Sequence, residues 1–228
     1  MGAVEPRRAG DEISVVVFDF DGLLMDTEST SLASWRHEWS QWGLSLDEGT
    51  FFVDHGADIT EERYAELAAA VGPSYDRQVS HTRRTAYRDR LHQELGLAVG
   101  ISRWIDDATS LGLRLAVASS SPRSWVAGHL ERAGVVEMFE VLACGDEVAG
   151  PKPAPDVYVL ALHRLGVDSS CAVAVEDTVH GVTAARAAGL RCIAIPNPFA
   201  DRLRFGEADL VLASAKEMSL SRALSSLG

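Results

Sequence analysis

Polar side chains that can bind metal ions or phosphate groups stand at the ends of several apolar runs in this sequence. They are Asp19 and Asp21 at the end of the first run, Ser119 after the second, Lys152 in a Pro-Lys-Pro-Ala-Pro loop, and Glu176 with Asp177. Such groups are costly to bury unless they have each other or a metal ion as partners. Mg²⁺ prefers oxygen ligands, and cations could neutralise a carboxylate and a phosphate ester together, which would let the carboxylate attack phosphorus.

Each of these residues also has a simpler structural interpretation. Asp177 or Thr178 could cap the helix that follows, Ser121 with Pro122 could begin another helix, and Lys152 could lie on the surface. Short motifs of this kind are weak evidence when taken singly. Their joint occurrence in order, with two neighbouring acids at each of two run ends, favours one shared site.

The apolar runs themselves predict the elements that would position these residues. Strands are predicted at residues 13–20, 113–118, 141–143, 171–175, 191–195 and 210–212. Helical patterns separate most of them, at residues 102–111, 122–133, 155–165 and 179–188, with a last helix from about residue 215. This alternation predicts an α/β fold, a Rossmann-like parallel sheet with helices on both faces, whose ligands bind beyond the carboxyl ends of the strands.

One stretch, residues 28–95, shows helical periodicity and no strand pattern. It predicts an inserted helical cap domain, with residues 12–27 and 96–228 forming the α/β core domain. The side chains expected in the core of the cap are Leu32, Trp35, Trp39 and Trp42, and those expected on a solvated helix face are Arg83, Arg84, Arg88 and Arg90. Asp26 is expected to support the turn after the first strand rather than to react.

Charge and cysteine content narrow the class of protein. The 228 residues include 33 acidic and 21 basic ones, a net charge of -12, so nucleic acid and anionic membranes are not expected partners. No apolar stretch has the length of a signal peptide core or a membrane span. The three cysteines are too few for a disulfide framework and are not spaced as zinc ligands, which indicates a reducing cytoplasm.

Four segments resemble the motifs of the haloacid dehalogenase superfamily. They are residues 19–28 (Asp-Phe-Asp-Gly-Leu-Leu-Met-Asp-Thr-Glu), 117–119 (Val-Ala-Ser), 152–156 (Lys-Pro-Ala-Pro-Asp) and 175–178 (Val-Glu-Asp-Thr) with Gly181. The chain resembles the branch with a small helical cap between the first two motifs, which includes β-phosphoglucomutase and many sugar phosphate phosphatases. The resemblance implies a Rossmann-like core and a mobile lid.

The residue types in these motifs suit a two-step phosphoryl transfer. Asp19 would be the nucleophile, and Asp21 would protonate the leaving oxygen and later deprotonate the water that hydrolyses the aspartyl phosphate. Ser119 and the backbone N–H of Ser120 would hold phosphoryl oxygens, and Lys152 would neutralise charge beside them.

The expected cofactor is Mg²⁺. Its expected ligands are Asp19, the backbone carbonyl of Asp21, Asp177 and Glu176, and no histidine ligand is needed. Gly22 would let the chain turn sharply after the second aspartate.

Other reactions of the superfamily are disfavoured by particular residues. Asp21 argues against dehalogenation, which has no leaving alcohol to protonate, and residues 28–95 lack the lysine that a phosphonatase would use. A β-phosphoglucomutase-like phosphotransferase is the alternative. It is weakened by Ser31, where such sequences carry histidine, and by the absence of arginine from residues 55–59. His55 and Gly56 in that turn are candidate substrate-binding residues.

We therefore predict a magnesium-dependent phosphatase that acts on a small phosphorylated metabolite, such as a sugar phosphate, and is a monomer or small homo-oligomer. A phosphate-accepting regulatory module is the alternative from another class, because it also gathers acids, a hydroxyl and a lysine at strand ends. Such modules need only about half this length, and an Asp-x-Asp pair with a helical lid has no purpose in them.

Overall fold

The computed structural model describes residues 12–51, 59–198 and 200–227. The chain divides into two compact units. The core unit comprises Met1–Leu24 and Leu97–Gly228, and the helical unit comprises Met25–Gly96.

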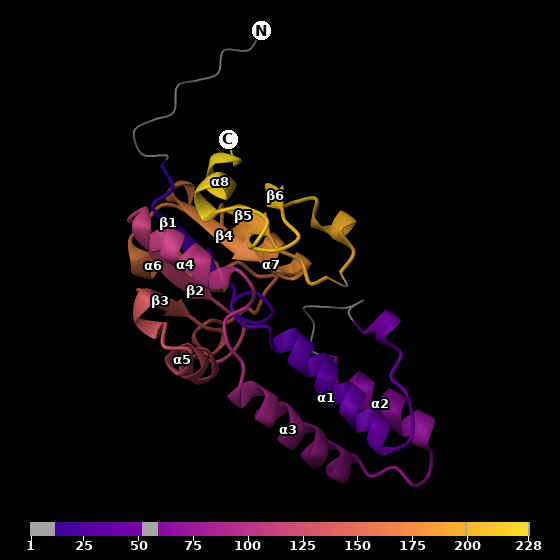
Figure 1. The fold of residues 1–228 in the computed structure, drawn as a ribbon. Coiled ribbons are helices and arrows are strands. Elements are labelled where there is room, and N and C mark those ends of the chain that lie inside the picture. Colours follow the sequence, from indigo (N-terminus) through magenta and orange to yellow (C-terminus); the bar gives the residue numbers. More distant parts are fainter. Residues whose placement is uncertain (1–11, 52–58, 199, 228) are drawn as a thin grey trace. The chain divides into compact units, whose positions relative to one another are not determined.

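The core unit is built on a six-stranded sheet in the order β3-β2-β1-β4-β5-β6, and every pair of neighbouring strands is parallel (Figure 1). The strands are β1 (Val15–Phe18), β2 (Arg114–Ala118), β3 (Val141–Ala143), β4 (Ala172–Glu176), β5 (Arg191–Ala194) and β6 (Leu210–Val211). The predicted α/β fold with a Rossmann-like parallel sheet is confirmed.

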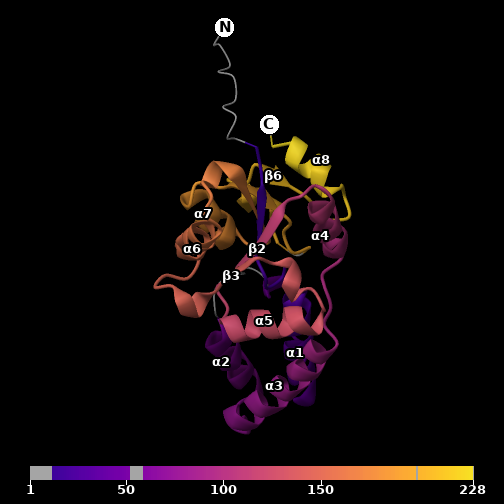
Figure 2. The same ribbon diagram turned by 90° about the vertical axis from the view of Figure 1, so that its left-hand side faces the viewer.

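Helices cover both faces of this sheet. They are α4 (Ile101–Ser110), α5 (Arg123–Arg132), α6 (Asp156–Leu165), α7 (Val179–Ala187) and α8 (Leu220–Ser225). Figure 2 shows α6 and α7 on one side of the strands and α4 and α8 on the other. Short 3₁₀ turns lie between them, at Val136–Met138, Gly145–Glu147, Ser169–Cys171 and Arg202–Phe205.

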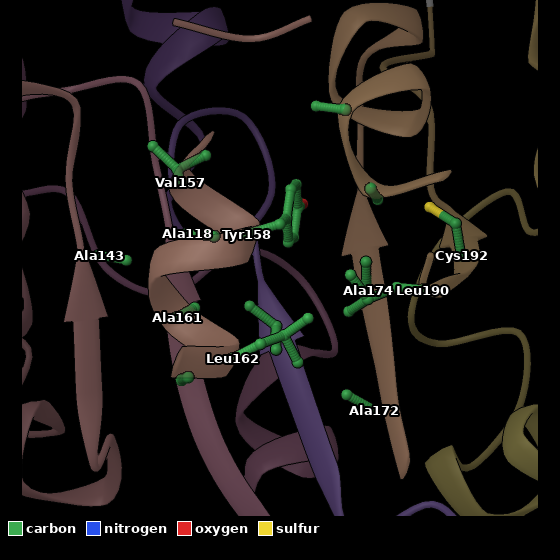
Figure 3. Close-up of a cluster of buried hydrophobic side chains, with 14 of the residues drawn as sticks. Ala118, Ala143, Val157, Tyr158, Ala161, Leu162, Ala172, Ala174, Leu190 and Cys192 are labelled. Carbon is green, nitrogen blue, oxygen red and sulfur yellow. The ribbon is translucent and has the colours of Figure 1, made fainter. Parts of the chain in front are cut away.

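The strands read as continuous apolar runs because both of their faces are buried. All four residues of β1 have no exposed surface, and β4 is buried throughout. Figure 3 shows the cluster between α6 and the sheet, where Leu162 and Tyr158 project from the helix toward the strands. Tyr158 places a phenol in an otherwise apolar layer, so its hydroxyl needs a hydrogen-bond partner there.

The strand register brings the candidate residues to one edge. Phe18 at the end of β1 is level with Val117 of β2 and with Val175 of β4. The next residues along each strand therefore emerge together at the carboxyl edge of the sheet. Asp19 continues this ladder, since its backbone N–H donates to the carbonyl of Val175 at 2.9 Å, and the N–H of Ser119 donates to Ala143 at 3.0 Å.

The last helix begins later than the predicted start near residue 215. Its N-cap is Ser219, whose side chain accepts a hydrogen bond from the backbone N–H of Arg222. The N–H of Leu220, the first residue of α8, donates to the Asp107 carboxylate at 2.9 Å. These two acceptors satisfy backbone N–H groups that a helix terminus leaves open, which explains where the helix begins.

The helical unit contains α1 (Thr27–Gln41), α2 (Thr60–Val71) and α3 (Arg77–Gln93), and a 3₁₀ turn at Glu48–Thr50. Asp26 is the N-cap of α1 and accepts a hydrogen bond from the N–H of Ser29 at 3.1 Å. Leu32 and Trp35 are buried with Tyr64 and Phe51, and Trp39 packs against them half-buried. Most of the apolar stripe read from the sequence thus lies in the core of this unit.

The arginines of α3 do not form one solvated face, contrary to the expectation. Arg84 is only 4% exposed. Its guanidinium donates to the Tyr64 hydroxyl at 2.8 Å and to Ser34 at 3.2 Å. Arg83 pairs with the buried carboxylate of Glu38 at 2.6 Å. A guanidinium can lie flat on aromatic rings and donate in several directions, so helical periodicity of charge does not by itself indicate exposure.

Within the described residues, no helix combines the length and the hydropathy that crossing a bilayer would require.

Candidate active site

The side chain of Lys152 contacts carboxylates at the ends of both β1 and β4. Its Nζ lies 2.5 Å from Oδ1 of Asp19 and 2.6 Å from Oε1 of Glu176, and it donates to the carbonyl of Ala118 at 2.8 Å. An ammonium group has three N–H donors, so these three oxygens use all of them. Lys152 therefore fixes the position of the Asp19 carboxylate in this state, and a phosphoryl group would have to replace one of the three acceptors to bind it.

Burial and charge act in opposite directions on this pair. Burial raises the pKa of Asp19, Lys152 lowers it and the Glu176 carboxylate raises it, which leaves a pKa of about 7. Burial alone would lower the pKa of Lys152, but the carboxylates of Asp19 and Glu176 outweigh it and raise that pKa above its usual value. The lysine is therefore charged, and a further cation beside Asp19 would favour the ionised carboxylate.

Asp19, Glu176 and Asp177 form a buried cluster in which one carboxylate oxygen from each residue lies within 4.8 Å of the other two. When all three are ionised, Lys152 balances one negative charge and leaves two, which is costly in a buried place. A divalent cation would supply the missing charge, and a set of carboxylate oxygens suits Mg²⁺. The residues present therefore fit the predicted metal ion.

Tyr158 of α6 contacts Glu176, and the sequence patterns did not predict this contact. Its hydroxyl donates to Oε1 of Glu176 at 2.5 Å, so this oxygen accepts both Tyr158 and Lys152. Burial raises the pKa of Tyr158 well above its usual value, and the phenol keeps its proton as a donor. A tyrosine on the apolar face of a helix, next to Val157 and Ala161, was the signal that could have indicated a buried polar partner.

Gly181 in α7 leaves the space that the Glu176 carboxylate occupies, because a Cβ at this position would overlap the carboxylate atoms. We expect Gly181→Ala to push Glu176 away from Lys152 and Tyr158. The expected result is a kcat about 10²-fold lower, in line with an ångström-scale displacement near reacting groups. Overpacking would also cost about 1–3 kcal/mol of stability, measured by thermal unfolding.

Gly206→Ala is the matched control for this glycine substitution. Gly206 has a φ of -62° and no atom near its hypothetical Cβ. It should keep both kcat and stability. Unchanged kcat in Gly181→Ala would contradict a requirement for this Glu176 position.

Three serines follow β2 in a tight loop. The Ser119 hydroxyl oxygen accepts a hydrogen bond from the Ser121 N–H at 3.0 Å, which leaves its O–H as a donor for a ligand. The hydroxyl of Ser120 accepts from the backbone N–H of Lys152 at 3.3 Å. Gly145 after β3 has no room for a Cβ, which would overlap the Ser120 carbonyl. The loop after β2 is thus held in place by Lys152 on one side and by close packing against Gly145 on the other.

Asp21 does not share the acidic cluster of Asp19. Its carboxylate accepts hydrogen bonds from the Ser121 hydroxyl at 2.5 Å and from the indole N–H of Trp125 at 3.1 Å.

Gly22 has a φ of 83°, which a residue with a Cβ adopts only at an energetic cost, so the sharp turn expected after Asp21 is present. Thr178, one of the suspected helix caps, does cap α7 through the N–H of Gly181 at 3.0 Å.

The candidate substrate-binding residues His55 and Gly56 lie outside the described residues.

A separate cavity of about 580 Å³ in the core unit lies at the opposite, amino ends of the strands, where it is lined by Ser14, Leu113 and Arg191. It contains none of the candidate site residues.

Comparisons with known proteins show the family of this chain. Residues 16–195 match the family described as haloacid dehalogenase-like hydrolase. Protein CbbY of Rhodobacter capsulatus is 34% identical over 212 residues, which cover 87% of this chain and 92% of that protein. The phosphorylated carbohydrates phosphatase of Thermotoga maritima is 27% identical over 186 residues, which cover 79% of this chain and 84% of that protein.

A solved structure shows the same similarity in three dimensions. Mutant CbbY from Rhodobacter sphaeroides, in complex with xylulose-(1,5)bisphosphate, has a TM-score of 0.70 and 31% sequence identity to this chain. The match covers 92% of this chain and 98% of that one. The chain belongs to the haloacid dehalogenase-like hydrolase family.

Proposed function

We propose that this chain, a phosphatase of the haloacid dehalogenase family, depends on Mg²⁺ and hydrolyses a small phosphorylated metabolite, in particular a sugar phosphate. The observation that carries the proposal is the buried cluster in which Lys152 holds Asp19 beside Glu176 and Asp177. The named activity of the Thermotoga maritima relative and the sugar bisphosphate in the Rhodobacter sphaeroides structure support the substrate class.

In the first step, a carboxylate oxygen of Asp19 forms a bond to phosphorus while the bond from phosphorus to the ester oxygen breaks. Lys152 orients this carboxylate through Oδ1, which leaves Oδ2 as the attacking oxygen. Asp21 transfers its proton to the departing ester oxygen. The Ser119 hydroxyl and the N–H of Ser120 donate to phosphoryl oxygens, and these hydrogen bonds strengthen as negative charge spreads in the transition state.

In the second step, a water molecule attacks the phosphorus of the aspartyl phosphate. Asp21, now ionised, takes the proton of this water, and the bond from phosphorus to Asp19 breaks to release inorganic phosphate. One carboxyl group acts as acid and then as base, so each turnover returns Asp21 to its starting state.

Mg²⁺ would be held by Asp19, Asp177 and the backbone carbonyl of Asp21, with Glu176 next to them, and would neutralise the phosphate ester. Oε1 of Glu176 already accepts hydrogen bonds from Lys152 and Tyr158, whereas Oε2 accepts one, from the Asp177 N–H at 3.3 Å, so Oε2 is the oxygen with more capacity for a metal ion.

The helical unit Met25–Gly96 is the proposed cap domain, and His55 and Gly56 are proposed to contact the substrate. The proposed location is the cytoplasm. The free thiols of Cys144, Cys171 and Cys192 support a reducing compartment.

The test is steady-state hydrolysis of p-nitrophenyl phosphate and of a panel of phosphorylated metabolites, compared by kcat/KM. We expect turnover to disappear with EDTA and to return with excess Mg²⁺, because the uncompensated carboxylates would otherwise repel the phosphate dianion. Mg²⁺ alone should also raise the melting temperature of the protein, and Asp177→Asn should reduce that increase.

Undiminished turnover after complete removal of divalent ions would contradict the metal dependence. A clear preference for a phosphoprotein over every sugar phosphate would contradict the substrate class while leaving the phosphatase activity intact.

A further inference from the structure

Both carboxylate oxygens of Asp21 are held by side chains that follow β2. The Ser121 hydroxyl donates to Oδ2 at 2.5 Å, and the indole N–H of Trp125, in the first turn of α5, donates to Oδ1 at 3.1 Å. We infer that Trp125 and Ser121 are positioning residues for Asp21, and that Trp125 determines which Asp21 oxygen carries the transferred proton. This inference rests on the proposed function.

Trp125 packs against a second ring, that of His129. The His129 ring lies one helical turn further on, with its centroid 4.0 Å from that of the Trp125 ring. Nδ1 of His129 donates to the Trp125 carbonyl at 3.0 Å. The His129 ring also makes an edge-type contact with Phe20, the residue between the two aspartates, at a centroid distance of 6.0 Å. Burial lowers the pKa of His129, which favours the neutral form of this ring.

The two donors differ in chemistry. An indole N–H can only donate, whereas a hydroxyl can donate or accept. Oδ1 of Asp21 therefore faces a permanent donor and stays unprotonated in both steps. Oδ2 faces Ser121, whose hydroxyl can donate to the ionised carboxylate and turn its O–H away when Oδ2 carries the proton. The proton given to the ester oxygen thus leaves Oδ2, and the proton taken from water returns to Oδ2.

Trp125→Phe tests this role, because it keeps an aromatic ring against His129 and removes the N–H. The assay compares p-nitrophenyl phosphate, whose phenolate needs little protonation to leave, with the alkyl phosphate that has the highest wild-type kcat/KM in the panel. We expect kcat/KM for the alkyl phosphate to fall about tenfold further than kcat/KM for p-nitrophenyl phosphate, since general acid catalysis matters most for the poorer leaving group. Ser121→Ala should shift this ratio in the same direction.

Trp104→Phe is the matched control. Trp104 is a buried tryptophan of α4, and its indole N–H donates to the carbonyl of Met218 at 3.0 Å, away from the site. This substitution should leave the ratio of the two kcat/KM values unchanged even where it lowers the melting temperature.

Equal losses on both substrates in Trp125→Phe and in Ser121→Ala would overturn the inference, while EDTA-sensitive turnover by the wild type would still support the proposed function. A wild type that hydrolyses neither ester would overturn both. If Trp125→Phe fails to fold, the ratio measured for Ser121→Ala decides the question.

Discussion

Asp19→Asn is expected to lower kcat for p-nitrophenyl phosphate by at least about 10⁴-fold, because an amide cannot form the aspartyl phosphate. The side chain keeps its size, and Oδ1 can still accept the hydrogen bond from Lys152, so the circular dichroism spectrum should not change. The measurement is steady-state release of p-nitrophenolate, with phosphate release measured in parallel.

Asp26→Asn is the control for this substitution. Asp26 caps α1 through the N–H of Ser29, and asparagine caps helices equally well, so activity and stability should both remain. A kcat in Asp19→Asn within tenfold of the wild type would rule out Asp19 as the nucleophile.

The same variant separates a phosphatase from a phosphate-accepting regulatory module. A phosphatase releases many phosphates per chain, whereas a module of that kind becomes labelled once at Asp19 and stops. Stoichiometric labelling of the wild type without turnover, lost in Asp19→Asn, would favour the regulatory alternative.

Lys152→Met is expected to lower kcat about 10³-fold, comparable with the loss of a donor that stabilises transition-state charge. Methionine fills a similar volume but removes the cation that contacts Asp19 and Glu176 at once. Two carboxylates then remain close together in a buried place, and the nucleophile loses the group that fixes Oδ1. The measurement is kcat for p-nitrophenyl phosphate at saturating Mg²⁺, with thermal unfolding as the second readout.

Two further lysine variants define what the ammonium group contributes. Lys152→Arg keeps the charge but spreads its donors over a planar fork, so it should not restore the three-way contact with Asp19, Glu176 and the Ala118 carbonyl. Lys216→Met removes a lysine from an exposed position and should change nothing. Near-normal kcat in Lys152→Met would show that the metal ion and the loop after β2 suffice to neutralise the reacting groups.

The sheet and the edge that carries the chemistry were predictable from local patterns. A parallel strand buried on both faces must be apolar along its whole length, so β1 and β4 are recognisable as strands in the sequence. The polar residues that follow these strands lie at the carboxyl edge of the sheet. The proximity of Asp19, Glu176 and Asp177 follows from this level register. The exact start of α8 did not follow, because a cap at Ser219 and a carboxylate from α4 decide it.

The sequence by itself determined the fold class, the order of the motifs and the pairing of acids with a lysine at strand ends, because these depend on periodicity and residue type. Only the tertiary structure decided which atoms meet. Asp21 contacts Ser121 and Trp125, which are 100 and 104 residues away in the sequence. Lys152 contacts Asp19, which is 133 residues away. Contacts between side chains so far apart depend on the register of the strands and on the direction in which each helix presents its residues, which no local pattern records.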